Sequence, residues 1–221
     1  DWLALREGAP GLYPDAVAFP DSAGQVRQLL ALAQAQDLCL IPYGGGTSVA
    51  GHINPPDSVR PVVTVSLARM NRLLDLDEQS LLATFGPGAS GPQVESQLRA
   101  RGYTLGHFPQ SWELSTLGGW VASRSSGQQS LRYGRIEQLF AGGTLETFAG
   151  PLEIATFPAS AAGPDLREVV LGCEGRFGII SQVKVRVSAL PADERRAVGK
   201  AAREAGLVTK FRDRETRATR L

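Results

Sequence analysis

The sequence is poor in the residues on which several common kinds of site depend. Among 221 residues there are two cysteines and two histidines. Cys39 and Cys173 lie far apart and form no Cys-x-x-Cys pair, which indicates two buried thiols in a reducing compartment. His52 and His107 have no histidine, cysteine or carboxylate at metal-ligand spacing, so the sequence predicts no metal site.

The chain also lacks a long apolar run and a strong net charge. No uninterrupted apolar segment approaches the roughly 18 residues of a membrane span, and no signal peptide is visible. The 23 Lys and Arg residues nearly balance the 22 Asp and Glu residues, for a net charge of +1. Nothing therefore indicates electrostatic binding of nucleic acid. We expect a globular protein of the cytoplasm.

The two ends of the chain differ from its middle. The opening residues, DWLALREGAPG, read as the middle of a gene product, so we expect an upstream segment. Residues 192–221 hold nine Lys and Arg against five Asp and Glu, and few large apolar residues. They predict a basic tail, helical or disordered, that is the remnant or the start of a further domain.

Helix and strand patterns alternate between the two ends, without the regular cadence of a doubly wound sheet. Helical patterns occur within residues 20–36, 86–103 and 115–127. Asp21 or Ser22 can cap the first helix and Ser90 the second. The apolar face expected for the first helix is Val26, Leu29, Leu30 and Ala33, and for the second Val94 and Leu98.

Strand patterns occur at residues 38–43, 61–67, 80–85 and 178–187. In the last of these, the half-buried face is expected to consist of Ile180, Val183, Val185 and Val187. The sequence therefore predicts an α+β fold with mixed sheets.

A literal G-x-G-x-x-G, the sequence GPGASG at residues 86–91, lies between a strand and a helix pattern. A nicotinamide-binding fold would also need an acidic residue about twenty positions further on, at the end of a second strand. Only Glu113 is acidic there, and it follows a loop that contains proline. We interpret residues 86–91 as a tight strand-to-helix turn.

The sequence GGGTS at residues 44–48 follows a strand pattern. Such a loop exposes successive backbone N–H groups that can surround an anion, and Thr47 and Ser48 add hydroxyl donors. No lysine follows the glycines, so a nucleoside-triphosphate P-loop is not indicated. On its own the segment predicts either an anion site or a flexible loop.

Two further stretches resemble linings of a polar ligand site. Residues 106–134 are dense in glycine and small hydroxyl residues, yet large side chains anchor them. These anchors are Trp112, Leu114, Leu117, Trp120 and Val121. Residues 174–180, EGRFGII, form another glycine turn that leads into a strand.

The motifs PYGGGTS, STLGGWVASRSSGQQSLRYGRIEQL, ASAAGPDL and EGRFGII follow one another in this order. Together they resemble the PCMH-type FAD-binding domain of the vanillyl-alcohol-oxidase type of FAD-linked oxidases. Within that family the likeness is strongest to the alkyldihydroxyacetonephosphate (alkylglycerone-phosphate) synthases and their bacterial relatives. It covers residues 14–191 and implies two α+β subdomains, about 14–66 and 80–190, with FAD between them.

The resemblance also implies which residues contact FAD. The first loop would surround the pyrophosphate, the second stretch would line the flavin and its ribityl chain, and the third would lie along the adenine and ribose. Carried over by position, these residues are Pro42, Tyr43, Gly44, Gly45, Gly46, Thr47, Ser48, Val49, Pro109, Gln110, Ser111, Trp112, Glu113, Leu114, Ser115, Thr116, Gly119, Ser123, Arg124, Ser125, Ser126, Glu174, Gly175, Arg176, Phe177, Gly178, Ile179 and Ile180.

Some relatives tether FAD covalently through a histidine in the glycine loop. That position is Thr47 here, so the resemblance implies a non-covalent cofactor. His52 and His107 are expected either near the cofactor or as hydrogen-bonded loop histidines. Arg124 and Arg132 are expected at the phosphate or the flavin, or in solvent. The sequence identifies no catalytic residue.

In the resembling family a C-terminal cap domain covers the flavin and binds substrate. Residues 192–221 are too few for it, so we expect the cap domain to be missing. The resemblance implies exchange of an acyl for an alkyl chain in ether-lipid synthesis, on a lipid-like substrate. Oxidation of a 2-hydroxy acid and a non-catalytic flavin-binding remnant are the alternatives. A homodimer, and a peroxisomal address in a eukaryote, are further expectations.

Overall fold

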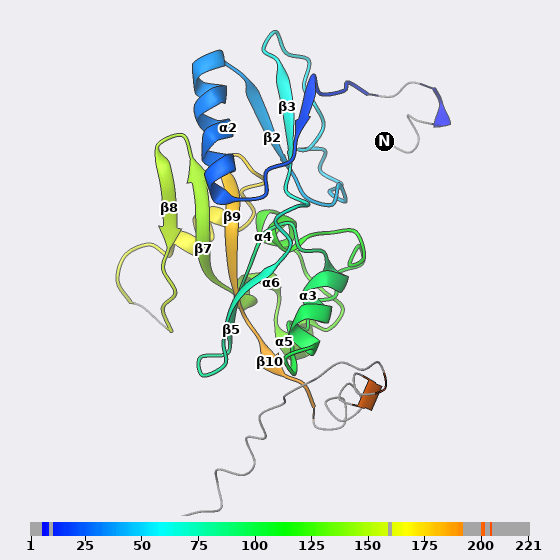
Figure 1. The fold of residues 1–221 in the computed structure, drawn as a ribbon, viewed down its shortest axis with the longest axis vertical. Coiled ribbons are helices and arrows are strands. Elements are labelled where there is room, and N and C mark those ends of the chain that lie inside the picture. The colour runs from blue at the N-terminus through cyan, green and yellow to red at the C-terminus, as the bar shows by residue number, and fades with distance from the viewer. Residues whose placement is uncertain (1–5, 9–10, 159–160, 192–199, 202–203, 205–221) are drawn as a thin grey trace, which may run out of the picture.

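The computed structural model describes residues 6–8, 11–158, 161–191, 200–201 and 204. A three-stranded parallel sheet and a five-stranded antiparallel sheet follow one another along the long axis (Figure 1). The parallel sheet has the order β1-β3-β2. Its strands are β1 (Ala16–Ala18), β2 (Cys39–Tyr43) and β3 (Val62–Ser66).

The antiparallel sheet has the order β4-β5-β9-β7-β8, and a two-stranded pair joins β10 to β6. These strands are β4 (Leu73–Asp77), β5 (Leu82–Phe85), β6 (Tyr103–Thr104), β7 (Phe140–Thr147), β8 (Gly150–Ile154), β9 (Ile179–Arg186) and β10 (Ser188–Ala189). The α+β class is confirmed, but the expectation of mixed sheets was wrong. The β1–α2–β2 segment crosses over through a helix and gives parallel strands, whereas short turns join β4 to β5 and β7 to β8 and give antiparallel ones.

Helix α2 (Ala23–Gln36) joins the two sheets. The Ser22 hydroxyl accepts a hydrogen bond from the Gln25 backbone N–H, so Ser22 is the N-cap. Val26 and Leu30 are buried in a small core with side chains from β3 and the start of β9. The helix packs against β7 and β9 of the antiparallel sheet.

An ion pair reinforces this packing. The Arg27 guanidinium lies 3.1 Å from the Glu146 carboxylate, which is 1% exposed on β7. The Ser181 hydroxyl of β9 donates to the same carboxylate oxygen at 2.9 Å. One buried carboxylate thereby joins α2 to two strands of the larger sheet.

The other described helices follow in the part of the chain that forms the antiparallel sheet. They are α3 (Gly91–Arg99), α4 (Leu117–Ser123), α5 (Ser130–Tyr133), α6 (Ile136–Leu139) and α7 (Leu166–Val170). Of these, α3, α4, α6 and α7 contribute buried side chains to the core of this sheet. Ser90 precedes α3, and its backbone N–H donates to the Gln93 side chain at 3.0 Å. Val94 and Leu98 are fully buried, as their spacing predicts.

A register shift in β9 explains an irregular spacing in the sequence. Ile180 and Val183 both point into the main core although three positions separate them. Leu145 pairs with Ile180 and its neighbour Thr144 with Gln182, so Ser181 is the extra residue of a bulge. The bulge turns Ser181 toward Glu146.

Of the two cysteines, Cys173 is buried and Cys39 is only half-buried. Burial raises the pKa of the Cys173 thiol. The expectation of two buried thiols was therefore wrong for Cys39, because β2 is an edge strand.

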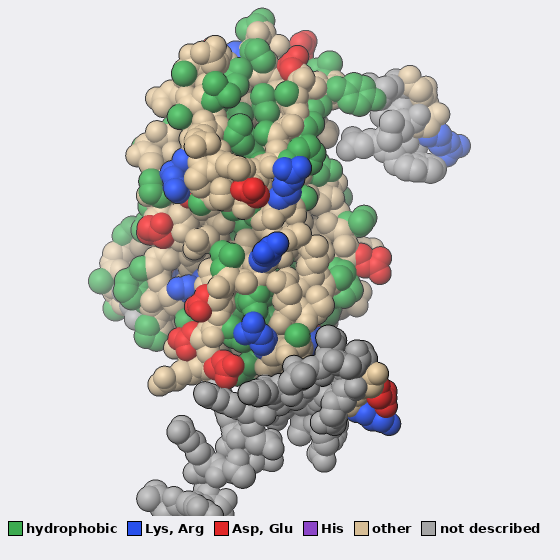
Figure 2. Space-filling model, viewed as in Figure 1, with side chains coloured by type: hydrophobic (Ala, Val, Ile, Leu, Met, Phe, Trp, Pro, Cys, Tyr) green, Lys and Arg blue, Asp and Glu red, His purple; other side chains and the backbone are tan. Residues whose placement is uncertain are grey.

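The tail predicted at residues 192–221 lies outside the described residues, apart from positions 200, 201 and 204. None of the helices that the structure describes is long and apolar enough to cross a membrane. On the face in Figure 2, basic and acidic side chains are interspersed, and neither sign forms a continuous patch.

Candidate functional site

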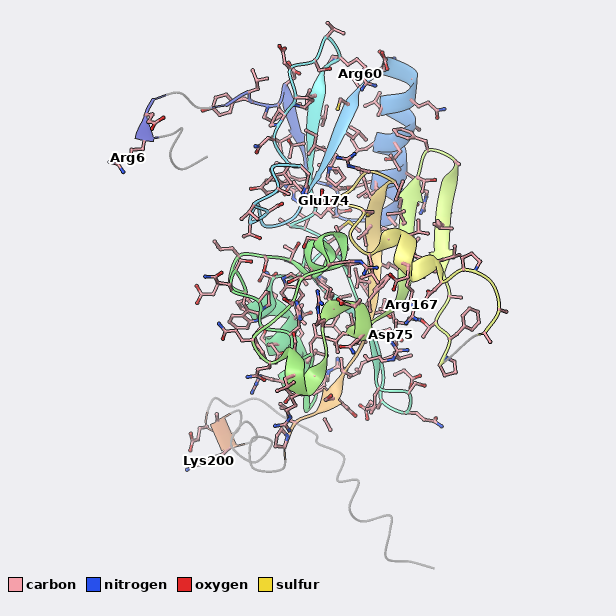
Figure 3. The ribbon with its side chains drawn as sticks, turned by 180° about the vertical axis from the view of Figure 1, so that it is seen from behind. Arg6, Arg60, Asp75, Arg167, Glu174 and Lys200 are labelled. Atoms are coloured by element: carbon pink, nitrogen blue, oxygen red, sulfur yellow. The ribbon has the colours of Figure 1, made fainter. Side chains whose placement is uncertain are left out.

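A cavity of about 440 Å³ lies between the end of β2 in the parallel sheet, α4 and the start of β9. Three segments far apart in the sequence form its walls: the first is residues 42–53 at the end of β2 and after it, the second residues 111–125 around α4, and the third residues 174–180 before and in β9. Figure 3 places Glu174 at this junction. We refer to residues 44–49 as the glycine loop.

The three glycines of the glycine loop allow it to approach residues 114–116. A Cβ on Gly44 would overlap the Thr116 side chain, and one on Gly45 would overlap the Leu114 carbonyl group. Gly46 has a φ of 69°, in the left-handed region that favours glycine. The glycines are thus needed for packing within the protein, independently of any ligand.

Most backbone N–H groups of the glycine loop have no hydrogen-bond acceptor among the described residues. Within the described part of the chain, those of Gly45 to Val49 donate to no hydrogen bond. The residues that carry them line the cavity, and the lining includes no lysine or arginine. Consecutive free N–H groups form a concave anion site without a cationic side chain. This donor set fits the pyrophosphate of FAD.

Several hydroxyl groups of the second wall are hydrogen-bonded within the protein. The Ser115 hydroxyl donates to the Ser111 carbonyl at 2.8 Å and accepts from Trp120 Nε1 at 2.7 Å. The Ser123 hydroxyl donates to the Gly119 carbonyl at 2.8 Å. The small hydroxyl residues expected to serve a ligand therefore also hold α4 and the Trp120 ring in place.

The third wall is a strained turn. Glu174 has a φ of 51°, and its N–H donates to the Ala122 carbonyl at 2.9 Å, which ties the turn to α4. Gly175 has a φ of 79°, and a Cβ there would lie 3.1 Å from the Pro42 ring. Residues 174–175 thus pack against both other walls.

His52 joins the glycine loop to the third wall. Its Nδ1 lies 3.1 Å from the Ser48 hydroxyl and 3.5 Å from a Glu174 carboxylate oxygen. His52 and Glu174 are the cavity-lining residues with ionisable imidazole or carboxylate groups. The described residues contain no group of three His, Cys, Asp or Glu side chains that could hold a metal ion.

The structure brings most of the predicted residues to the cavity, while their contact with FAD stays a prediction. Those that line it are Pro42, Tyr43, Gly44, Gly45, Gly46, Thr47, Ser48, Val49, Ser111, Ser115, Thr116, Gly119, Ser123, Ser125, Glu174, Gly175, Gly178 and Ile180. Those that do not are Pro109, Gln110, Trp112, Glu113, Leu114, Arg124, Ser126, Arg176, Phe177 and Ile179.

Local packing explains several of the residues that do not line the cavity. Ile179 is buried in the core under α2, on the face of β9 opposite Ile180. The Arg124 side chain pairs with Glu168 and donates to the Leu171 carbonyl. Arg132 does not line the cavity either, and its guanidinium lies over the neighbouring Tyr133 ring.

His52, expected near the cofactor or as a hydrogen-bonded loop histidine, lines the cavity. Six further lining residues were not predicted: Ala50, Ile53, Leu67, Gly118, Trp120 and Ala122. Helical periodicity could have found two of them, because Gly118 and Ala122 are one turn apart on the face that also carries Gly119 and Ser123. Leu67 follows β3 and reaches the cavity only through the pairing of β3 with β2.

His107 lies behind the second wall and is 1% exposed. Its Nε2 lies 3.2 Å from the Ser125 hydroxyl, and its ring packs edge-on against Trp120 with a centroid distance of 4.9 Å. Burial lowers the pKa of His107 to about 4, against the opposing effect of the Glu137 charge. The imidazole is therefore neutral near pH 7.

This lowered pKa predicts a loss of stability in acid. The unfolded state takes up a proton on residue 107 as the pH falls below about 6.5, whereas the folded state does so only near 4. Relative to His107→Phe, the wild-type protein should lose about 2–3 kcal/mol of unfolding free energy between pH 7 and pH 4.5. Urea denaturation of both proteins at the two pH values measures the difference; parallel losses would contradict it.

Comparison with known proteins agrees with this arrangement. Residues 14–150 match the FAD binding domain family. The alkyldihydroxyacetonephosphate synthase of Dictyostelium discoideum is 38% identical over 86% of this chain and 31% of the relative. Glycolate oxidase subunit GlcD of Bacillus subtilis is 27% identical over 80% of this chain and 38% of that relative. This chain thus spans about a third of the length of these relatives.

A solved structure of an alkyldihydroxyacetonephosphate synthase superposes with a TM-score of 0.82 at 38% identity. The superposition covers 87% of this chain and 35% of the other. The free N–H groups of the glycine loop, the three-walled cavity and these matches agree on the cofactor. The chain belongs to the FAD binding domain family, in its PCMH-type form, and FAD is its cofactor.

Proposed function

We propose that this chain is the FAD-binding part of an enzyme that exchanges an acyl for an alkyl chain on dihydroxyacetonephosphate, as in ether-lipid synthesis. The similarity to alkyldihydroxyacetonephosphate synthases, at 38% identity, supports this reaction above others. The observation that carries the binding role is the run of unpaired N–H groups from Gly45 to Val49 along the cavity.

In this proposal FAD lies between two subdomains, residues 14–66 and 80–190, and its pyrophosphate accepts hydrogen bonds from the glycine loop. Charge-assisted hydrogen bonds of this kind contribute roughly 1.5–3 kcal/mol each. Bound FAD supplies the redox-active ring system on which enzymes of this family depend. The intact protein would take a lipid-like substrate, form a homodimer, and reside in the cytoplasm, or in the peroxisome of a eukaryote.

A second candidate is oxidation of a 2-hydroxy acid, favoured by the similarity to a glycolate oxidase subunit. A third is a flavin-binding protein without turnover. All three use the same cavity, so the cofactor site alone does not separate them.

The proposed reaction predicts a specific product. The complete protein that contains this sequence, loaded with FAD, should convert acyl-dihydroxyacetonephosphate and a radiolabelled long-chain alcohol into a labelled ether and free fatty acid. A parallel assay offers glycolate and D-lactate with a dye as electron acceptor. Dye reduction without ether formation would favour the second candidate, and flavin binding without either product the third.

The packing of the glycine loop predicts a large effect of a small substitution. In Gly45→Ala the added methyl group would collide with the Leu114 backbone, displace the loop and misdirect its N–H groups. We expect FAD affinity to fall at least about tenfold, the loss of roughly one charge-assisted hydrogen bond. Fluorescence titration with FAD measures the change.

Gly24→Ala is the matched control. Gly24 lies in α2, where a Cβ would meet only the Ser22 hydroxyl at 4.0 Å. The Gly24→Ala protein should therefore bind FAD as the wild type does. Equal affinities for Gly45→Ala and Gly24→Ala would contradict the assignment of the glycine loop.

The threonine in the glycine loop predicts how FAD is retained. A threonine hydroxyl does not provide the ring nitrogen through which relatives with a histidine tether their flavin, so Thr47 implies a non-covalent cofactor. Acid precipitation of the FAD-loaded protein should leave all yellow colour in the supernatant. Flavin fluorescence in the washed pellet would contradict this expectation.

A further inference from the structure

The Ser125 hydroxyl differs from the other hydroxyl groups of the second wall. The Ser115 and Ser123 hydroxyls donate to backbone carbonyls of their own segment. The Ser125 hydroxyl instead contacts a buried side chain, His107, eighteen residues earlier in the chain. Ser125 itself lines the cavity. Ser125 thus lies between the buried His107 imidazole and the cavity.

The backbone on both sides of this contact is held. The Ser125 N–H donates to the Trp120 carbonyl at 3.0 Å, and its carbonyl accepts from the Ile136 N–H at 3.3 Å. The Trp120 ring that supports His107 is in turn held by the Ser115 hydroxyl. Rotation about the Ser125 side chain is therefore the main remaining freedom, and the imidazole nitrogen restricts it.

We propose that His107 is a positioning residue for FAD, which fixes the Ser125 hydroxyl so that its oxygen accepts a hydrogen bond from the bound cofactor. The inference rests on the proposed function, because it requires that FAD occupy the cavity. It assigns a role to a buried histidine that lies outside the cavity lining.

The direction of the hydrogen bond follows from the surroundings of His107. In the described part of the protein, His107 Nδ1 and the Glu137 Oε2 atom are both buried without a hydrogen-bond partner. We infer the tautomer with its proton on Nδ1, because a proton on that unpartnered nitrogen would be attracted by the negative charge of Glu137, which acts on the imidazole. Nε2 then accepts from the Ser125 O–H.

The Ser125 oxygen keeps its lone pairs for the cavity. It would therefore accept a hydrogen bond from a donor, which on FAD is the imide N–H of the flavin ring, a hydroxyl of the ribityl or ribose units, or the adenine amino group. The pKa of His107 is about 4, so the imidazole is neutral near pH 7 and protonation does not reverse the direction of this hydrogen bond. An imidazolium would donate to the Ser125 oxygen and compete with the cofactor.

A double-mutant cycle tests the inference. Ser125→Ala removes the acceptor, and His107→Phe keeps a ring against Trp120 but removes the nitrogen. Each single variant should bind FAD about five- to tenfold more weakly, as expected for one hydrogen bond. The double variant should lose no more than Ser125→Ala alone, because His107 acts through Ser125. Titration of flavin fluorescence gives the affinities.

Three further measurements separate positioning from general stability. Ser96→Ala, an exposed serine of α3 that donates to the Gln93 carbonyl, is the matched control and should bind FAD normally. The visible spectrum of the bound flavin should change equally in both single variants if the contact is to the ring. Thermal unfolding without FAD identifies any variant that is poorly folded.

Additive losses in the double variant, or normal affinity in His107→Phe, would overturn the inference while leaving the proposed function intact. If His107→Phe does not fold, His107→Leu, which also has no hydrogen-bonding side-chain atom, replaces it in the cycle with the same expected result. A wild-type protein that binds no FAD would overturn both the inference and the proposed function.

Discussion

The arrangement of the site depends on one close backbone contact, that of the glycine loop with Leu114 to Thr116. A Cβ at Gly45 would occupy the space of the Leu114 carbonyl group, and a Cβ at Gly44 that of the Thr116 side chain. The contact joins the end of β2 in the parallel sheet to the segment that leads into α4. Among the described residues, the N–H groups of Gly45 to Val49 have no protein partner and are free for a ligand.

The packing of α2 supports this contact from the other side. Its apolar face closes a core with β3 and β9, and Arg27 pairs with the buried Glu146 on β7. Removing Arg27 would be costly, because the Glu146 charge would stay buried without its partner. The two sheets are thus held together at two places, the glycine-loop contact and the packing of α2, and the cavity lies where the sheets meet.

Much of the fold follows from local patterns. Helices α2 and α3 occur where apolar spacing and capping residues predict them, and β9 where alternating valines do. Strands β4, β7 and β8 were not predicted, since their apolar residues are interrupted by aspartate, glycine or proline and their pairing is non-local. The roles of the hydroxyl groups were only partly predictable, because sequence does not say which acceptor lies nearest to each.

By itself the sequence determined the class of ligand, because the ordered glycine and hydroxyl motifs carry the family resemblance and each is a contiguous segment. It also determined that the glycine loop has no histidine for a covalent flavin. Only the tertiary structure decided why three glycines are needed, which motif residues line the cavity, and that His107 contacts Ser125. These depend on contacts between residues distant in the chain, which local spacing does not encode.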